Sequence, residues 1–191
     1  MSVPGGTLHI LDGREAAARE AELIALHDQV FGSGDADFAR RLGVWRRQPG
    51  FMLAEARHGG YLVGYVCGMP LRSSTDWWRD LTAPMPATVT TEHPGRTFAL
   101  TQLLVRASWR RQGIGTELHD LILDGRGEER AAVRLTPGAA AAQAAFKKWG
   151  WTKVARTRGP GPTAPAYDVL ICPLPASPLE SPTEGVPQGR S

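Results

Sequence analysis

Residues 103–116, with the sequence LLVRASWRRQGIGT, predict a buried strand that leads through a short turn directly into a helix. The turn carries the pattern Arg-x-x-Gly-x-Gly over residues 110–115. Glycine lets the backbone approach a bound group closely and adopt angles that other residues resist. The first N–H groups of a helix have no partner within it and lie at its positive end, so they favour an anion such as a pyrophosphate. The segment therefore predicts an anion-binding turn, with Arg110 and Arg111 adding positive charge beside it.

Spacing alone leaves a second interpretation open, in which this segment is a strand-to-helix turn that binds nothing. A related pattern, Gln-x-x-Gly-x-Gly, occurs at residues 29–34. It follows a predicted helix rather than a strand, so we interpret it as the end of that helix. No Lys-Ser/Thr pair follows the glycines at 110–115, and no Gly-x-Gly-x-x-Gly follows the first predicted strand. The pattern therefore differs from two common nucleotide-binding fingerprints, which disfavours a nucleotide-binding protein of another fold.

Hydrophobic periodicity along the rest of the chain predicts strands and helices in mixed order, as in an α/β sheet with helices on both faces. Residues 70–96 contain several prolines and predict a long loop with one helical turn, and a loop of that length is usually functional or disordered. The expected strands are residues 6–11, 51–57, 61–69, 98–105, 131–135 and 167–174, and the expected helices are 14–31, 35–48, 116–124 and 139–149.

Composition bounds the class of protein. The chain has 191 residues of which 42% are hydrophobic, enough for one domain over residues 1–174, while the Pro- and Ser-rich residues 175–191 predict a disordered tail. The net charge of +3 comes without a block of Lys or Arg, so we expect no nucleic-acid partner. The start resembles no signal peptide and no apolar run could span a bilayer, which predicts a cytoplasmic protein without a membrane partner. Cys67 and Cys172 lie in apolar runs without metal-ligand spacing, so we expect buried thiols and no metal.

Residues 103–123, LLVRASWRRQGIGTELHDLIL, resemble the cofactor-binding motif of the GNAT-superfamily N-acetyltransferases. The helix ending in FKKWGW, residues 146–151, is similar to the aromatic-x-x-x-Gly-aromatic signature of that family. The resemblance covers residues 96–174 and is only topological over residues 6–70. It implies an α/β GNAT fold, with a mixed central sheet of about six to seven strands, splayed at its central strands and flanked by about four helices. It also implies transfer of an acetyl group from acetyl-CoA to an amine.

The resemblance assigns the cofactor site. Backbone groups of residues 103–105 would pair with the pantetheine arm as an added strand, and the N–H of Leu103 or Leu104 would polarise the thioester carbonyl. The N–H groups of residues 111–116 would hold the pyrophosphate. The predicted cofactor-binding residues are Leu103, Leu104, Val105, Arg110, Arg111, Gln112, Gly113, Ile114, Gly115 and Thr116.

The usual catalytic residues of the family do not carry over. Phe146 stands where a Tyr acid is common, Ala139 where an Asn is common, and Arg134 where some members hold a Glu base. We therefore predict Glu92 and Tyr167 as catalytic candidates, although Glu92 is also typical of a solvated loop residue and Tyr167 of a packing aromatic.

Other candidates surround these two. His93 is a further candidate beside Glu92, whereas His119 is interpreted as a helix-surface residue. Asp76, Trp77 and Trp78 in the long loop are predicted to bind the acceptor, with one tryptophan facing the core and the other lining a site. Asp76 is equally typical of a helix cap.

Three functions remain open for a member of this family. The aromatic loop favours a small-molecule amine as acceptor, which would attack the thioester of acetyl-CoA directly in a ternary complex. A protein or peptide amine is a second possibility, and a non-catalytic CoA-binding module is a third, which the missing Tyr supports slightly. Family habit also suggests a homodimer.

Overall fold

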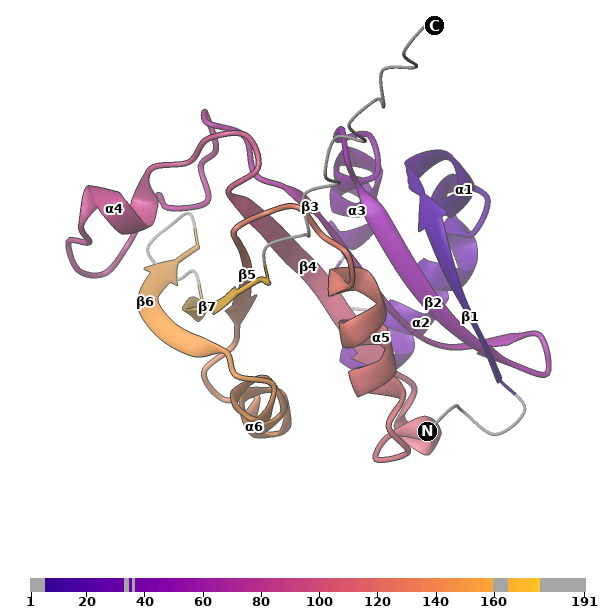
Figure 1. Cartoon of the computed structure of the whole chain (residues 1–191). Coiled ribbons are helices and arrows are strands. Elements are labelled where there is room, and N and C mark those ends of the chain that lie inside the picture. Colours follow the sequence, from indigo (N-terminus) through magenta and orange to yellow (C-terminus); the bar gives the residue numbers. More distant parts are fainter. Residues whose placement is uncertain (1–5, 33–34, 36, 160–164, 176–191) are drawn as a thin grey trace, which may run out of the picture.

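The computed structural model describes residues 6–32, 35, 37–159 and 165–175, in which seven strands form one sheet (Figure 1). In spatial order the strands are β1 (Gly6–Asp12), β2 (Met52–His58), β3 (Tyr61–Pro70), β4 (Thr97–Val105), β5 (Arg130–Leu135), β7 (Ala166–Pro173) and β6 (Thr152–Arg158). Only β4 and β5 pair in parallel, and every other neighbour is antiparallel. This architecture confirms the predicted mixed α/β fold.

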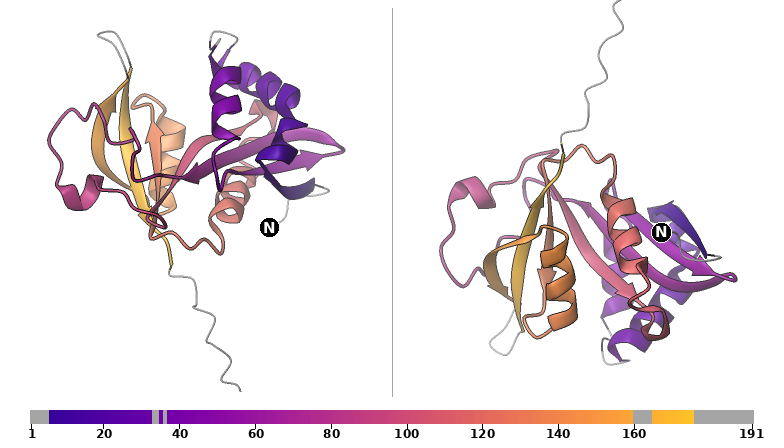
Figure 2. Two further views of the ribbon diagram at one scale, coloured as in Figure 1. Left: turned by 90° about the horizontal axis from the view of Figure 1, so that it is seen from above. Right: turned by 60° about the horizontal axis from the view of Figure 1, so that its bottom comes forward.

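Helices cover both faces of this sheet, as the two views of Figure 2 show. The helices α1 (Gly13–Ala17), α2 (Glu20–Phe31) and α3 (Phe38–Trp45) pack on one face of β2–β4. The helix α5 (Ile114–Leu123) packs on the other face of the same strands, and α6 (Ala140–Lys148) packs on that face beside β5 and β7. The short helix α4 (Ala87–Thr90) lies in the long loop before β4, and the 3₁₀ turn η1 (Ala107–Trp109) follows β4.

The helices α2, α3 and α5 each bury an apolar stripe against the sheet. In α5, Ile114, Leu118 and Ile122 recur every four residues and are at most 1% exposed, so this stripe anchors the helix to the sheet. The helices α2 and α3 bury Leu23 and Phe38 in the same way against the opposite face. None of the described helices combines the length and the apolar character that a membrane span would need.

A bulge in β4 marks the centre of the sheet. Cys67 of β3 pairs with Gln102 and the next residue, Gly68, pairs with Leu100, so Thr101 is an extra residue without a β3 partner. An extra residue exchanges the two faces of the strand beyond it. Accordingly Leu100 lies in the core beneath α5, whereas Leu104 lies in the core beneath α1–α3.

The predicted elements differ from the structure at three places. The single helix expected over residues 14–31 is two helices, because α1 packs on β1 and β2 while α2 packs on β3 and β4. The helix expected over 35–48 is limited to α3. The strand β6 was not expected, because it is an edge strand of Thr, Lys and Arg that buries little and lacks an apolar alternation. The expected disordered tail lies almost entirely outside the described residues.

Candidate active site

The parallel strands β4 and β5 separate at a fork. Their last paired residues are Leu100 and Val133, although β4 continues to Val105 and β5 to Leu135. The splay that the sequence resemblance implied is therefore present. Beyond the fork, one edge of β4 has no strand beside it among the described residues.

The register of β4 determines which backbone groups face this open edge. Arg106 N–H donates to Val63 O at 2.8 Å, just beyond the last β3–β4 pair. Because hydrogen bonding alternates along an antiparallel strand, the N–H and C=O groups of Leu104 face β3, and those of Leu103 and Val105 face the open edge. Pairing with a cofactor arm stays a prediction for Leu103 and Val105, whereas the backbone groups of Leu104 face β3 and not the open edge.

A rigid turn connects the open edge to α5. Arg110 Nε donates to Val105 O at 3.0 Å, and Gln112 Nε2 donates to Ser108 O at 3.2 Å. Arg111 and Gly113 both have left-handed backbone conformations, with φ of 63° and 90°. Glycine adopts this conformation without strain, so Gly113 is the residue that the turn requires where α5 begins.

The turn contains a row of backbone N–H groups that donate no hydrogen bond to the described residues. None of the hydrogen bonds among the described residues uses the N–H groups of residues 111–115, whereas Thr116 N–H donates to Gly113 O at 2.9 Å. A Cβ added to Gly113 would meet nothing within 4 Å, so space is open above the row. These donors sit at the positive end of a ten-residue helix, where an anion is favoured. The geometry fits the pyrophosphate that the sequence predicted.

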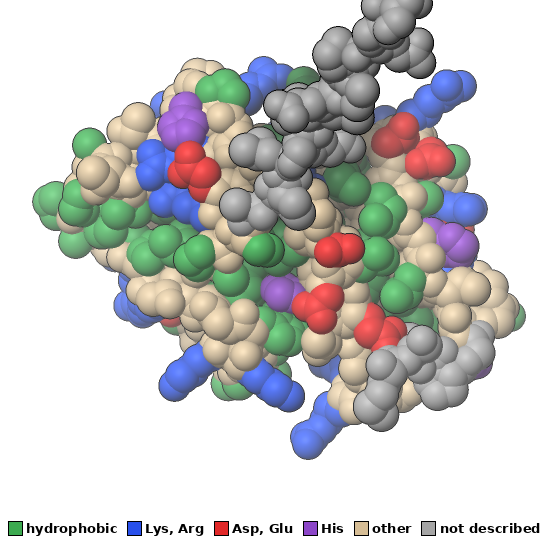
Figure 3. All heavy atoms as spheres, in the orientation of Figure 1, with side chains coloured by type: hydrophobic (Ala, Val, Ile, Leu, Met, Phe, Trp, Pro, Cys, Tyr) green, Lys and Arg blue, Asp and Glu red, His purple; other side chains and the backbone are tan. Residues whose placement is uncertain are grey.

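Basic side chains stand on both sides of the open edge. Arg110 and Arg111 in the turn are exposed, and so are Lys147 and Lys148 in the last turn of α6. In Figure 3 basic side chains project along the lower border of the molecule, whereas acidic ones gather over α5. A ligand with several phosphates would therefore meet positive charge at the mouth of the fork.

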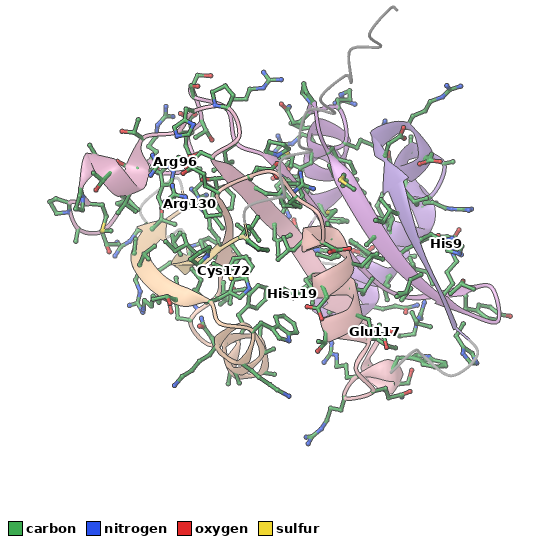
Figure 4. The ribbon with its side chains drawn as sticks, in the orientation of Figure 1. His9, Arg96, Glu117, His119, Arg130 and Cys172 are labelled. Atoms are coloured by element: carbon green, nitrogen blue, oxygen red, sulfur yellow. The ribbon has the colours of Figure 1, made fainter. Side chains whose placement is uncertain are left out.

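An aromatic cluster joins α5 to α6 below the fork. Trp149 Nε1 donates to Thr116 Oγ1 at 3.3 Å, and the Trp149 ring stacks on His119 with centroids 4.4 Å apart. Phe146 is buried edge-on against both Trp149 and Trp151. The interpretation of His119 as a surface residue is wrong, because it is only 7% exposed and lies between α5 and α6 (Figure 4).

The hydrogen bonds of His119 determine its tautomer. Trp151 Nε1 donates to His119 Nε2 at 3.0 Å, so this nitrogen is the unprotonated one. The other nitrogen, Nδ1, lies 2.8 Å from Asp120 Oδ1 and is the donor. In the sequence, His119 lies four residues after Gly115 and three before Ile122, and this helical spacing was the signal for an inward-facing residue.

Glu92 is a buried anchor of the long loop. Its Oε1 accepts hydrogen bonds from Trp78 Nε1 at 2.8 Å, Thr97 Oγ1 at 2.9 Å and Arg130 Nη2 at 2.9 Å. Arg130, labelled in Figure 4, also donates to Val89 O in α4 at 2.7 Å. The catalytic role of Glu92 stays a prediction, but these contacts are those of a residue that holds the loop on β4 and β5.

The predicted acceptor residues lie apart from one another. Trp78 is buried against Glu92 and belongs to the core, whereas Trp77 is half-buried beneath Arg134 of β5. Asp76 is exposed and pairs with Arg79, and His93 is also exposed, 3.4 Å from Glu129. Burial lowers the pKa of Arg134 on β5, and the half-buried Tyr167 on β7 lies close enough to oppose part of that lowering. The structure thus brings Trp77 and Tyr167 to Arg134, which the sequence singled out only as a departure.

The two thiols differ in their surroundings. Cys67 is fully buried, and burial raises its pKa to about 12. Cys172 is only half-buried, contrary to expectation, and desolvation raises its pKa as well. Among the described residues no group of three or more His, Cys, Asp or Glu side chains is placed to hold a metal ion.

Comparison with models of known protein families identifies the family of this chain. A family model described as the Acetyltransferase (GNAT) family matches residues 16–151. The chain belongs to the GNAT family. It is therefore an acetyltransferase, as the sequence resemblance implied. The comparison with curated proteins gives no match.

Solved GNAT structures share the fold of this chain at low identity. The ribosomal-protein-S18-alanine N-acetyltransferase from Escherichia coli is 14% identical, with a TM-score of 0.63, covering 92% of this chain and 98% of that one. Aminoglycoside 6'-acetyltransferase type Ii is 14% identical, with a TM-score of 0.65, covering 90% and 99%. Arabidopsis thaliana Naa50, solved with the bisubstrate analogue CoA-Ac-MVNAL, is 13% identical, with a TM-score of 0.58, covering 88% and 98%. These neighbours include proteins named for small-molecule and for protein acceptors.

Proposed function

We propose that this GNAT acetyltransferase transfers an acetyl group from acetyl-CoA to the amine of a small molecule, by direct attack in a ternary complex. The observation that carries the proposal is the row of uncommitted N–H groups at residues 111–115, placed where the open edge of β4 ends. An edge with free backbone groups suits an amide-containing arm, and the row suits a pyrophosphate. One neighbour was solved with coenzyme A, which supports the same ligand here.

The backbone would do most of the cofactor binding. Leu103 and Val105 would bind the pantetheine arm, and the N–H groups of Arg111, Gln112, Gly113, Ile114 and Gly115 would bind the pyrophosphate. Bound acetyl-CoA supplies an electrophilic thioester carbonyl. The Leu103 N–H faces the open edge nearest the fork and would stabilise negative charge as it develops on the carbonyl oxygen.

Direct transfer is favoured over an acyl-enzyme because neither cysteine is a suitable nucleophile. The thiolate is the reactive form, and the raised pKa of Cys67 keeps its thiol protonated at neutral pH. Cys172 has a raised pKa too and lies in β7, which does not pair with β4. We therefore expect the acceptor amine to attack the thioester itself.

The half-buried Trp77 beside the fork supports a small-molecule acceptor, because an aromatic wall binds apolar or cationic groups. Two neighbours are named for aminoglycosides, which supports a small-molecule acceptor, although other neighbours are named for proteins. A cytoplasmic location and a homodimer stay predictions from the sequence.

Tyr167 is the proton-handling residue that we favour. Its hydroxyl makes no hydrogen bond to the described residues, so it is free to exchange a proton with the reacting groups. We expect Tyr167→Phe to lower kcat roughly 100-fold, the lower range for general acid–base catalysis, and to leave the KM for acetyl-CoA unchanged. Steady-state kinetics would check this, with melting temperature as the control for folding. An unchanged kcat would remove Tyr167 from the mechanism.

Ligand-induced stabilisation tests the proposed function. A ligand that binds only the folded chain at 100 times its Kd stabilises it by about 2.7 kcal/mol, roughly 5–10 °C for a domain of this size. We expect this shift with acetyl-CoA and CoA but not with ATP, which lacks the arm for β4. Thiol release with a panel of amines would then identify acceptors. If neither form of CoA shifts the melting temperature, the proposal fails.

A further inference from the structure

Arg134 occupies the first position of β5 beyond the fork. The last β4–β5 pair is Leu100 with Val133, so Arg134 stands where the two strands begin to separate. Its guanidinium carbon lies 4.5 Å from the centre of the Trp77 ring, and its Nη2 donates to Trp77 O. The side chain is therefore held on the loop-covered face of the sheet, at the point where the open edge of β4 starts.

Among the described residues Arg134 has no carboxylate partner, unlike Arg130 on the same strand. Arg130 lies on the same strand and face, and it pairs with the buried carboxylate of Glu92 at 2.9 Å. No carboxylate of the described residues forms an ion pair with Arg134, and its Nε is buried without an acceptor. Trp77 Nε1, directly beneath it, is a second buried donor without an acceptor. Burial without a counter-ion also lowers the pKa of Arg134.

Around this point of the sheet, Arg134 is the cation that forms no ion pair with a described side chain. Tyr167 lies on the same face as Arg134, because Val169 pairs with Arg134 and Tyr167 is two residues away. Tyr167 also lies within electrostatic reach of Arg41 in α3. Arg41 is already neutralised, since its Nη1 donates to Asp35 Oδ1 at 2.9 Å. Asp80 acts on Arg134 only through space and is itself exposed.

We propose that Arg134 binds a carboxylate on the acceptor, so that the acceptor is a small amine carrying a carboxylate, as in a free amino acid. This inference rests on the proposed function and names its substrate class. The carboxylate would supply the acceptor oxygens that the arginine lacks, in the paired geometry that a guanidinium favours. In the reaction, the acetyl carbon forms its bond to the amine nitrogen as its bond to sulfur breaks. The nitrogen loses one proton and the sulfur gains one, so CoA leaves as a thiol.

Matched pairs of acceptors test this inference. Each L-amino acid is compared with its own amide, which keeps the α-amine and lacks the carboxylate. We expect kcat/KM to be at least about tenfold higher for the acids, which corresponds to about 1.4 kcal/mol. Thermal shift in the presence of CoA, where no acetyl group can be transferred, gives an independent readout, and there only the acids should stabilise the wild-type protein further.

Variants then assign the preference to one side chain. Arg134→Met should abolish both the kinetic preference and the added stabilisation, and Arg134→Lys should restore part of each. The matched control is Arg158→Met, because Arg158 is an exposed strand arginine on β6. If CoA binds and amides are acetylated as well as acids, the inference is overturned while the proposed function stands. A preference for acids that survives Arg134→Met overturns the assignment to Arg134.

Discussion

Gly113→Glu should abolish the stabilisation by CoA and acetyl-CoA while the chain still folds. Gly113 has φ of 90° and begins α5, in the row of N–H groups that we assign to the pyrophosphate. A glutamate there strains the left-handed backbone and places a negative charge where the phosphates would bind. We therefore expect the shift of roughly 5–10 °C predicted for the wild type at saturating CoA to disappear, and kcat/KM for acetyl-CoA to fall by at least about 100-fold.

The control is the same substitution at a comparable glycine. Gly95 has φ of 79°, and a Cβ there would also meet nothing within 4 Å. It precedes β4, at the opposite end of that strand from the turn. Gly95→Glu should therefore carry a similar backbone strain and keep the full CoA shift. If both variants bind CoA as the wild type does, the row at residues 111–115 is not the pyrophosphate site.

Glu92→Gln should be the most destabilising conservative change in the long loop. The substitution keeps the shape of the side chain but removes the charge that neutralises the buried Arg130. Leaving one partner of a buried ion pair unneutralised costs about 3–5 kcal/mol. At about 3 kcal/mol the melting temperature would fall by roughly 6–12 °C. Chemical denaturation, analysed as a two-state transition, would measure the loss of unfolding free energy.

Two comparisons separate this structural role from catalysis. Glu129→Gln alters an exposed carboxylate close by and should leave stability nearly unchanged. The double variant Glu92→Gln with Arg130→Met should recover part of the lost stability, because no buried charge is then left unpaired. If Glu92→Gln instead folds with wild-type stability and loses kcat alone, Glu92 is the catalytic residue that the sequence predicted.

The cofactor half of the site could be predicted because its signals are local. A strand, a glycine turn and a helix follow one another within residues 103–116, so the row of N–H groups depends on neighbours in sequence. The register that separates Leu103 from Leu104 was not predictable in this way. It depends on the extra residue at Thr101 and on pairing with β3, which begins forty residues earlier in the chain.

The acceptor half of the site depends on contacts between distant segments. Glu92 has the sequence surroundings of a loop residue, and only the fold shows that Arg130 and Trp78 enclose it. Arg134 looked merely like a departure from a family pattern until the fold placed Trp77 beneath it. The edge strand β6 was missed for a related reason, since its pairing with β7 rather than its own hydrophobicity holds it in the sheet.

The bulge at Thr101 fixes the register of β4, and the register determines which backbone groups face the open edge, whatever side chains the strand carries. Substitutions along β4 and the turn can therefore accumulate without altering what the ligand meets, provided that no residue is inserted or lost and the glycines remain. The acceptor half, around Arg134 and Trp77, has no such protection, because its donors are side chains. Within one fold, the cofactor can thus stay constant over long divergence while the acceptor changes with a few substitutions.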